Sequence, residues 1–267
     1  MTPTLKASLR TTTLLSILLS SNLVAQDTGD KLTIEIGTLS TDVDTVLRVD
    51  SASGNVGTSI DLEEDLGFEP GKQINRFDLH YRFTDKHSLK YSFFQLNRSA
   101  RHEIDETIVV GDTEYLIQAN ITAGFDYTVH SVSYGYSLRA DKESNLDLLL
   151  GVYYLNTDFS IAEDSLGNSN AVNGAGPLPL IGLNYEKNLS GNWNLGARAT
   201  IFTLDTGEYS GSVFDTRIRV DYQFTDRFAL GLAYNWQRLN LGVEDTQVNG
   251  DFDMTMQGAE LSAIFRF

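Results

Sequence analysis

The residues best suited to acid–base chemistry in this sequence are its four histidines, His80, His87, His102 and His130. A histidine beside a serine and an acid would favour hydrolysis of an ester or amide bond. His130 is followed at once by Ser131, but neighbouring side chains of a β-strand point to opposite faces. The next residue on the face of His130 is Val132, and Glu143, the acid that would complete such a set, lies beyond the end of the expected strand 121–139. We therefore expect no catalytic residue, and we interpret the histidines as structural or surface residues.

Clusters of carboxylates are the second group that could do chemistry, because Ca²⁺ and Mg²⁺ take oxygen ligands. No calcium-binding loop spacing is present, however, and residues 61–65 fit a short capped turn equally well. We therefore expect solvated acidic loops, with no metal and no cofactor. The clusters comprise Asp42, Asp44, Asp50, Asp61, Glu63, Glu64, Asp65 and Glu69, then Glu103, Asp105, Glu106, Asp112 and Glu114, then Glu244, Asp245, Asp251 and Asp253.

The composition excludes further classes of function. The chain has 20 basic and 36 acidic residues and a formal net charge of −16 at pH 7. Nucleic acid is not an expected partner, because binding to phosphates needs a basic surface. The sequence has no cysteine, which excludes disulfides, thiolate metal sites and cysteine nucleophiles.

The first 25 residues have the layout of a secretory signal peptide. Lys6 and Arg10 give a positive start, residues 14–19 an apolar middle, and Ala25 the end of a small-residue cleavage site. We expect cleavage near Ala25, which leaves residues 26–267 as one domain. No run of about 18 apolar residues follows, so no transmembrane helix is expected.

Strict alternation of apolar and polar residues is the main structural signal. Phe77, Leu79 and Tyr81 alternate with polar residues, and the same period returns several times along the chain. This period is typical of strands with one apolar face. The sequence predicts an all-β fold, a transmembrane antiparallel up-and-down β-barrel. Ten strands are expected at 31–50, 74–83, 88–106, 121–139, 145–161, 177–188, 192–206, 213–224, 228–244 and 251–267.

The first predicted strand is the least regular. Its apolar residues change from even positions, such as Ile34 and Ile36, to odd positions, such as Val43 and Leu47. An extra residue in one strand would produce such a change, so we predict a β-bulge near Gly37. The alternative is an eight-stranded barrel with part of residues 31–73 folded elsewhere.

Connections of two different lengths favour an outer-membrane barrel over a soluble sandwich. Short polar connections, such as residues 84–87, alternate with longer or acidic ones, expected at 51–73, 107–120, 162–176, 207–212 and 245–250. Outer-membrane barrels have short periplasmic turns, long extracellular loops and a girdle of aromatic residues at each interface. The girdles are expected from Tyr81, Phe83, Tyr134, Tyr136, Tyr153, Tyr154, Tyr222, Phe224, Tyr234 and Trp236.

The last strand ends on an aromatic residue. Leu261, Ala263, Phe265 and Phe267 share one face, and the pattern resembles the terminal signal read by the barrel assembly machinery. Ser262 stands where that pattern usually has glycine. We expect Phe267 to contact this machinery.

Two segments resemble sequences shared by uncharacterised proteobacterial outer-membrane β-barrel-domain proteins. They are DTVLRVDSASGNVGTSIDLEEDLGF, from Asp44 to Phe68, and YRFTDKHSLKYSFFQLNRS, from Tyr81 to Ser99. The resemblance implies a barrel in the outer membrane of a Gram-negative bacterium, in contact with its lipid and lipopolysaccharide. It implies no catalytic residue.

Many charged residues are expected to face the lumen, either as a selectivity filter or as mutually neutralising pairs, and the second is preferred. They are Arg76, Asp78, Arg82, Lys90, Arg98, Asp147, Glu186, Arg198, Arg217, Arg219, Asp221, Glu260 and Arg266. Long side chains should close a lumen of this size, although inner glycines, Gly151 among them, could open a cleft.

We expect a non-enzymatic protein, with a structural or surface-interaction role or a narrow channel. The alternatives are an outer-membrane enzyme acting on lipid A, phospholipid or peptide, and a small-solute porin. Lipid A deacylases and phospholipases keep histidine and serine two residues apart, which this sequence does not.

Overall fold

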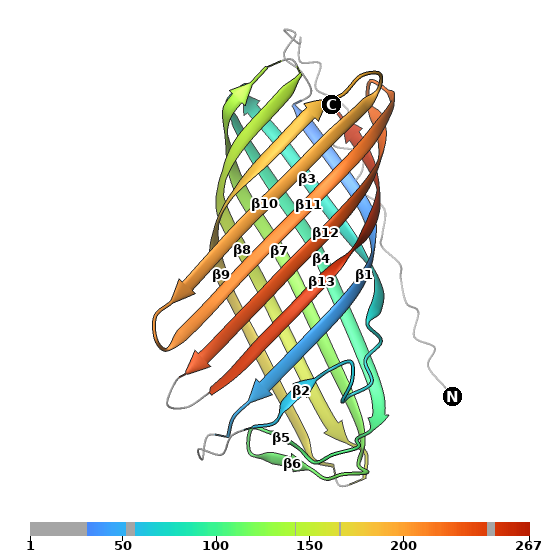
Figure 1. Ribbon diagram of the computed structural model, residues 1–267, viewed down its shortest axis with the longest axis vertical. Coiled ribbons are helices and arrows are strands. Elements are labelled where there is room, and N and C mark those ends of the chain that lie inside the picture. The colour runs from blue at the N-terminus through green and yellow to red at the C-terminus, as the bar shows by residue number, and fades with distance from the viewer. Residues whose placement is uncertain (1–30, 52–56, 142, 166, 245–248) are drawn as a thin grey trace, which may run out of the picture.

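The computed structural model describes residues 31–51, 57–141, 143–165, 167–244 and 249–267, and these form an all-β structure (Figure 1). The expected signal peptide, residues 1–25 with cleavage near Ala25, lies outside the described residues, as does Asp245. Within the described residues, no helix is long and apolar enough to cross a membrane.

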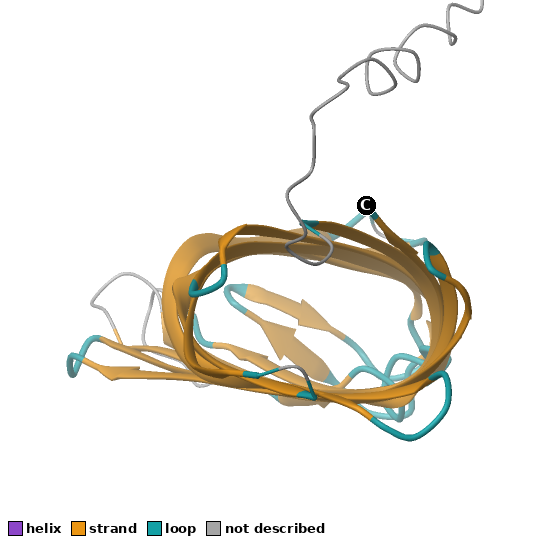
Figure 2. Cartoon of the chain, turned by 90° about the horizontal axis from the view of Figure 1, so that it is seen from above, coloured by secondary structure: helices purple, strands orange, loops and turns teal. Residues whose placement is uncertain are grey.

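Ten long strands close into one antiparallel barrel, in which each strand pairs with the next and β13 pairs with β1 (Figure 2). This confirms the ten-stranded up-and-down barrel. The strands are β1 (Leu32–Val49), β3 (Gly71–Thr84), β4 (His87–Glu103), β7 (Asn120–Ala140), β8 (Ser144–Glu163), β9 (Ser169–Asn188), β10 (Trp193–Asp205), β11 (Tyr209–Thr225), β12 (Phe228–Glu244) and β13 (Asn249–Arg266).

Three short strands were not expected from the sequence. β2 (Ser59–Asp61) pairs with the end of β1, while β5 (Ile108–Val110) and β6 (Thr113–Tyr115) form a separate hairpin. The long loop expected at 162–176 is wrong over most of its length. Residues 169–176 belong to β9 and pair with residues 155–162 of β8, which offers them a partner ladder although they have no apolar period of their own.

The two ends of the barrel differ. One end of the barrel, where β1 begins and β13 finishes, has the short connections, and we call it the turn end (top of Figure 1). The described residues of these connections are 85–86, 141, 143, 189–192 and 226–227. The opposite end, the loop end, carries residues 57–70 of the connection between β1 and β3, and the longer connection 104–119. The β5–β6 hairpin lies there, across the mouth of the barrel (Figures 1 and 2).

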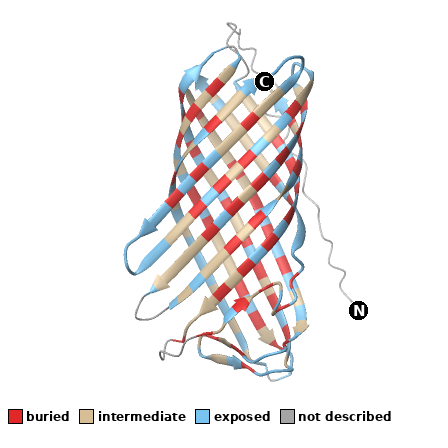
Figure 3. Ribbon diagram, in the orientation of Figure 1, coloured by how far each residue is buried: buried red, intermediate tan, exposed pale blue. Residues whose placement is uncertain are grey.

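The strands exchange their apolar and polar faces partway along the barrel. On β4, Tyr91 and Phe93 face outward near the turn end, whereas Gln95 and Asn97 face outward nearer the loop end. The inward face changes in the opposite sense, and Phe94 is only 2% exposed. An apolar outer face suits lipid, and an apolar inner face suits a barrel wall surrounded by water. Buried positions alternate with more exposed ones along much of the barrel wall (Figure 3).

This exchange of faces replaces the β-bulge expected near Gly37, a prediction that is wrong. β1 pairs with β13 in an unbroken register from Thr33 to Val49, and with β3 from Leu32 to Asp42. Ile36 faces outward to lipid, whereas Val43 faces inward, because the surroundings of the strand change and its pairing does not. Glycine at position 37 instead leaves room for the side chain of Glu260, because a Cβ atom there would lie 2.5 Å from Oε1 of Glu260.

The outward apolar band is the lipid-facing surface of the transmembrane barrel. Its members include Leu232 and Leu261, each 63% exposed. Ring pairs such as Tyr81–Phe83 and Trp193–Tyr222 lie near the turn end of this band, as expected for an aromatic girdle. Tyr153 was wrongly assigned to a girdle. It is 5% exposed and faces the lumen, because its neighbour Tyr154 takes the outward position.

Candidate functional site in the barrel lumen

The turn-end half of the lumen holds a network of ion pairs centred on Glu35. One carboxylate oxygen of Glu35 lies 2.5 Å from a guanidinium nitrogen of Arg217, and the other lies 2.6 Å from one of Arg219. The hydroxyl of Ser262 also donates to Glu35, at 2.6 Å. These side chains come from β1, β11 and β13, and alternation along each strand directs them inward.

The same arginines connect Glu35 to further carboxylates. Arg217 lies 2.7 Å from Glu260, and Arg219 lies 3.1 Å from Asp221. Asp221 is also 2.9 Å from Arg266, near the turn end. Glu260 and Asp221 are both fully buried, and both are matched by a cation.

A second group of ion pairs connects β3 to β10 and β11. Nε of Arg76 lies 2.8 Å from Asp78, and Arg76 also donates to the hydroxyl of Ser92 at 2.8 Å. Arg198 lies between two carboxylates, 3.7 Å from Asp78 and 3.6 Å from Asp215. Arg198 thereby joins carboxylates of two strands that are not neighbours in the sheet.

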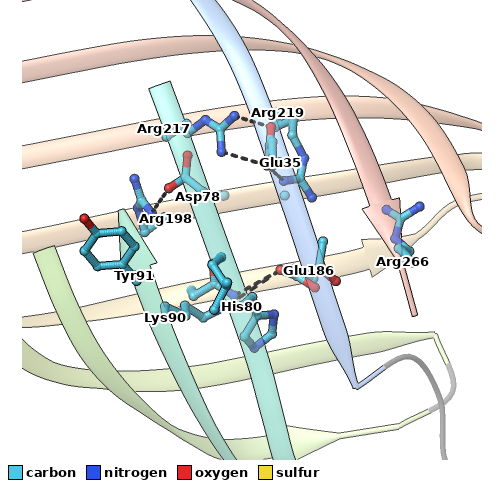
Figure 4. A pocket seen from close by; sticks show the side chains of 15 residues that line it. Glu35, Asp78, His80, Lys90, Tyr91, Glu186, Arg198, Arg217, Arg219 and Arg266 are labelled. Carbon is cyan, nitrogen blue, oxygen red and sulfur yellow. Dashed lines mark hydrogen bonds and ion pairs between the residues drawn. The ribbon is translucent and has the colours of Figure 1, made fainter. Parts of the chain in front are cut away.

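The contacts are looser where Lys90 faces the lumen. Its ammonium lies 3.9 Å from both Asp147 and Glu186. Nε2 of His80 is buried and has no hydrogen-bond partner among the described residues. Between these groups lies a cavity of about 90 Å³ (Figure 4). A cavity of this size holds a few water molecules but no sugar.

We call this set the lumen charge cluster. It consists of Glu35, Arg76, Asp78, Lys90, Asp147, Glu186, Arg198, Asp215, Arg217, Arg219, Asp221, Glu260 and Arg266. Sequence reasoning missed Glu35 and Asp215. The alternation of Ile34 and Ile36 would have placed Glu35 on the inner face. The expected pairing of the inward charges with one another is what the structure contains.

The inner glycine at position 151 does not open a cleft. A Cβ atom at Gly151 would lie 2.2 Å from the carbonyl oxygen of Val132 on the neighbouring strand. The glycine therefore permits a close approach of β7 to β8.

The loop-end half of the lumen is filled by apolar side chains, which we call the loop-end core. Leu62 and Leu66, from the connection between β1 and β3, are completely buried, as is Tyr115 of β6. They pack with inward residues of the barrel such as Leu96 and Met254. The connection and the hairpin therefore close the mouth from inside.

One buried ion pair lies within this core. Arg98, the only predicted lumen charge found in this half, pairs with Glu63 and donates to Oγ1 of Thr45 at 2.7 Å. Its guanidinium also lies 5.3 Å from the ring centres of both Phe68 and Phe125. Burial raises the pKa of Glu63 above its ordinary value, and the hydrogen bond and charge of Arg98 oppose that shift.

The acidic segment 61–65 is a capped turn. Oδ1 of Asp61 accepts hydrogen bonds from the amides of Glu63 and Glu64, both at 2.9 Å. In return, the amide of Asp61 donates to Asp65 at 2.7 Å. This reciprocal arrangement resembles a capping box, except that the returning carboxylate is four residues after the cap instead of three. Asp61 and Asp65 thus stabilise the turn that carries Leu62 and Glu63 inward.

The four histidines lie apart. His80 faces the lumen, His87 contacts Tyr134 at the turn end, and His102 lies beneath Gly67 at the loop end. His130 faces lipid, where Nδ1 is 2.9 Å from the hydroxyl of Tyr91. Ser131 lies on the other side of the same wall and lines the lumen. Within the described residues, no histidine meets a serine and an acid in one place.

Comparisons with known proteins agree with this architecture. A family model described as "Protein of unknown function, DUF481" matches residues 78–257. A search of curated proteins gave no match.

Solved structures that resemble the chain are outer-membrane barrels. The outer membrane protease OmpT of Escherichia coli has a TM-score of 0.58 at 12% identity, over 90% of this chain and 98% of that one. OprG of Pseudomonas aeruginosa has a TM-score of 0.40 at 10% identity, over 90% and 97%. Ail of Yersinia pestis has a TM-score of 0.39 at 12% identity, over 90% and 100%. At such identities the likeness to OmpT extends to the fold alone.

Proposed function

Because the chain belongs to the DUF481 family of proteins of unknown function and has a filled lumen, we propose that it is a non-enzymatic integral outer-membrane protein with a structural or surface-interaction role. The observation that carries the proposal is that two different kinds of packing fill the two halves of the lumen. Ion pairs fill the turn-end half, and the loop-end core fills the other.

The dimensions of the barrel support a closed lumen. Barrel diameter grows with strand number, and about eight strands give an interior that side chains just fill, against 16–18 strands in open porins. Ten strands add little room, and six long cations of the lumen charge cluster occupy it. Each of the seven carboxylates forms an ion pair with one of these cations, so no carboxylate of the cluster is left unpaired to select a mobile ion.

The outer faces of the strands support the proposed location. The apolar band would lie in the outer membrane, with the turn end in the periplasm and the polar outer wall of the loop end outside the cell. The partners proposed for this surface are the surrounding lipid and lipopolysaccharide. The barrel assembly machinery, through Phe267, is the partner proposed during insertion.

Conductance of the purified protein in a planar lipid bilayer tests the closed lumen, together with swelling of liposomes in sugars of graded size. We expect no conductance steps and no swelling with a disaccharide. Rapid uptake of a disaccharide would overturn the proposal and make a small-solute porin the better description.

Variants can test the two closures separately. One variant carries Leu62→Ser, Leu66→Ser and Phe68→Ser in the loop-end core, and another carries Arg198→Ala, Arg217→Ala and Arg219→Ala. Each should remain closed to sugars, because the other half of the lumen stays filled, and only their combination should swell. Swelling with either variant alone would show that one half carries the closure by itself.

A narrow ion channel is the second candidate, and one observation favours it. The contacts of Lys90 are long, and the unpartnered nitrogen of His80 lies beside it on the 90 Å³ cavity. A chain of water molecules there could carry small ions if it reached the loop end. This candidate would be favoured over the closed barrel if the protein conducted ions without taking up sugars, and if the Lys90→Met variant lost that ion conductance.

A further inference from the structure

The barrel wall has a seam between β9 and β10. β9 pairs with β8 along its length, but with β10 only from Ile181 to Asn188. Among the residues that the structure describes, residues 169–180 therefore have one strand neighbour instead of two. Across the seam, residues 202–205 of β10 pair only with β11, and the β10–β11 hairpin diverges from the wall (Figure 1, lower left).

Two prolines explain why the ladder stops. Pro177 and Pro179 pair with Tyr154 and Val152 of β8. A proline has no amide hydrogen, so each must occupy a non-hydrogen-bonded position of that ladder. The backbone positions that lack a donor then face β10. The ladder between β9 and β10 cannot continue past Leu180 without losing two of its hydrogen bonds.

The diverging hairpin leaves apolar residues of the inner face uncovered. Leu204 is 46% exposed and Tyr209 is 49% exposed, although both continue the inward faces of their strands. Deeper along the same faces, Phe202 and Val213 are buried in the loop-end core. The exposed surface thus leads without a break from the seam into that core.

The seam begins where the lipid-facing band ends. Ile181 and Ile201 form the last pair of the ladder, and both face outward with 49% of their surface exposed. The next outward residues toward the loop end are Pro179 on β9 and Thr203 on β10. The uncovered inner face is therefore continuous, through the seam, with the surface that contacts lipid.

From this continuity we infer that the seam accepts the acyl chain of a lipid from the outer leaflet. The chain passes between Pro179 and Thr203 and lies on Phe202, Leu204 and Tyr209. The inference rests on the proposed outer-membrane location and not on the closed lumen. None of these five side chains is charged, so the surface suits hydrocarbon.

An added peptide strand fits the seam less well than an acyl chain. A strand bound to β9 would need donors from the backbone at positions 177 and 179, where the prolines have none. A slender chain without hydrogen-bonding groups needs no such donors. Burial of its methylene groups on Leu204 and Tyr209 is favourable by itself.

Photo-crosslinking tests the inference on the unmodified full chain in phosphatidylcholine vesicles containing a phospholipid with a diazirine in the middle of one acyl chain. Mass spectrometry would locate the adducts. We expect adducts on Phe202, Leu204 and Tyr209 in addition to lipid-facing residues such as Leu232. Leu116 is the matched control, because it is apolar and 54% exposed but lies in the loop-end connection 104–119.

A variant with Pro177→Thr and Pro179→Thr restores both backbone donors. We expect it to extend the β9–β10 ladder and to reduce labelling of Leu204 and Tyr209 to the level of Leu116. Labelling of Leu232 should not change, which reports that the barrel is inserted. If this variant fails to fold, Leu204→Asn with Tyr209→Asn, at two exposed positions, provides a second comparison, in which the labelling of Phe202 should fall to the level of Leu116.

Adducts confined to lipid-facing residues in the unmodified chain would overturn the seam while leaving the membrane barrel intact. Loss of the Leu232 adduct as well would instead contradict the proposed location. Unchanged labelling of Phe202 in both variants would show that the acyl chain reaches this residue by another route, and it would overturn the seam too.

Discussion

Arg217 and Glu35 form an ion pair of 2.5 Å that crosses the lumen. Arg217 lies on β11 and Glu35 on β1, and two other strands, β12 and β13, separate them in the wall. Glu35 also accepts from Arg219 and Ser262, so one carboxylate of β1 holds groups from two other strands, β11 and β13. This carboxylate is the point where the lumen charge cluster is most sensitive to change.

Substitution of Glu35 should destabilise the barrel strongly. Glu35→Ala leaves two buried guanidinium groups without their main partner, and breaking such a buried pair typically costs about 3–5 kcal/mol. The measurement is the free energy of unfolding in urea from lipid vesicles. The control is Glu64→Ala, at an exposed position, which should change it by less than about 0.5 kcal/mol. Equal effects of the two substitutions would contradict the central place given to Glu35.

Substitution of arginine at two neighbouring residues of β12 should lower the free energy of unfolding for two different reasons. Leu232 is 63% exposed on the lipid face, and Leu232→Arg should cost about 2–4 kcal/mol if the residue lies at the bilayer midplane. Ala233 is 4% exposed and faces the lumen, so Ala233→Arg should act through crowding. Unfolding of Leu232→Arg with unchanged free energy would show that the register or the membrane assignment is wrong.

The ion pair in the loop-end core should behave non-additively. Arg98→Ala leaves Glu63 partly buried without its cation, and we expect a cost of about 3–5 kcal/mol. Adding Glu63→Gln should recover part of that loss, because burial raises the pKa of Glu63 and so favours a neutral group there. A double-mutant cycle of unfolding free energies measures the coupling. Simple addition of the two losses would rule out a direct interaction.

The ring of Phe267 should matter for assembly more than for stability. Its backbone joins residues 31 and 32 through three hydrogen bonds of 2.8–3.1 Å, while the side chain is 59% exposed. Phe267→Ser keeps the backbone bonds and removes the ring. Pulse-chase of heat-modifiable migration in cells should then show slower assembly, with an unchanged free energy of unfolding. Equal assembly rates would mean that the terminal pattern has been misread.

Much of the barrel follows from local alternation of residue types. Strands such as β12, from Phe228 to Glu244, have a long alternating stretch, here from Phe228 to Trp236, and their bounds were predicted closely. The start of β9 could not be predicted in this way. Residues 169–176 are small and polar, and they form a strand because β8 extends beside them. β2, β5 and β6 are three residues long each, which is too short for an alternating period to be recognised.

The presence of charged side chains in the lumen was predictable, but their pairing partners were less so. Inward charges could be assigned by alternation, but which cation meets which carboxylate depends on the stagger between strands, which a single strand does not encode. The loop-end core was missed because an apolar inner face was not expected in a membrane barrel. In β1, the change from Ile36 to Val43 was its visible sign, and it was interpreted as a bulge.

Because the two faces of β1 exchange partway along the strand, a shift in its pairing register would be unfavourable both in the membrane and in the water beyond it. A slip of one residue against β13 would turn Glu35 toward hydrocarbon and Leu39 toward water in the same movement, because side chains alternate with a period of two. In a strand with a single amphipathic pattern, only one of these errors would arise. The strand that closes the barrel therefore has its alignment specified independently by the membrane and by the aqueous exterior.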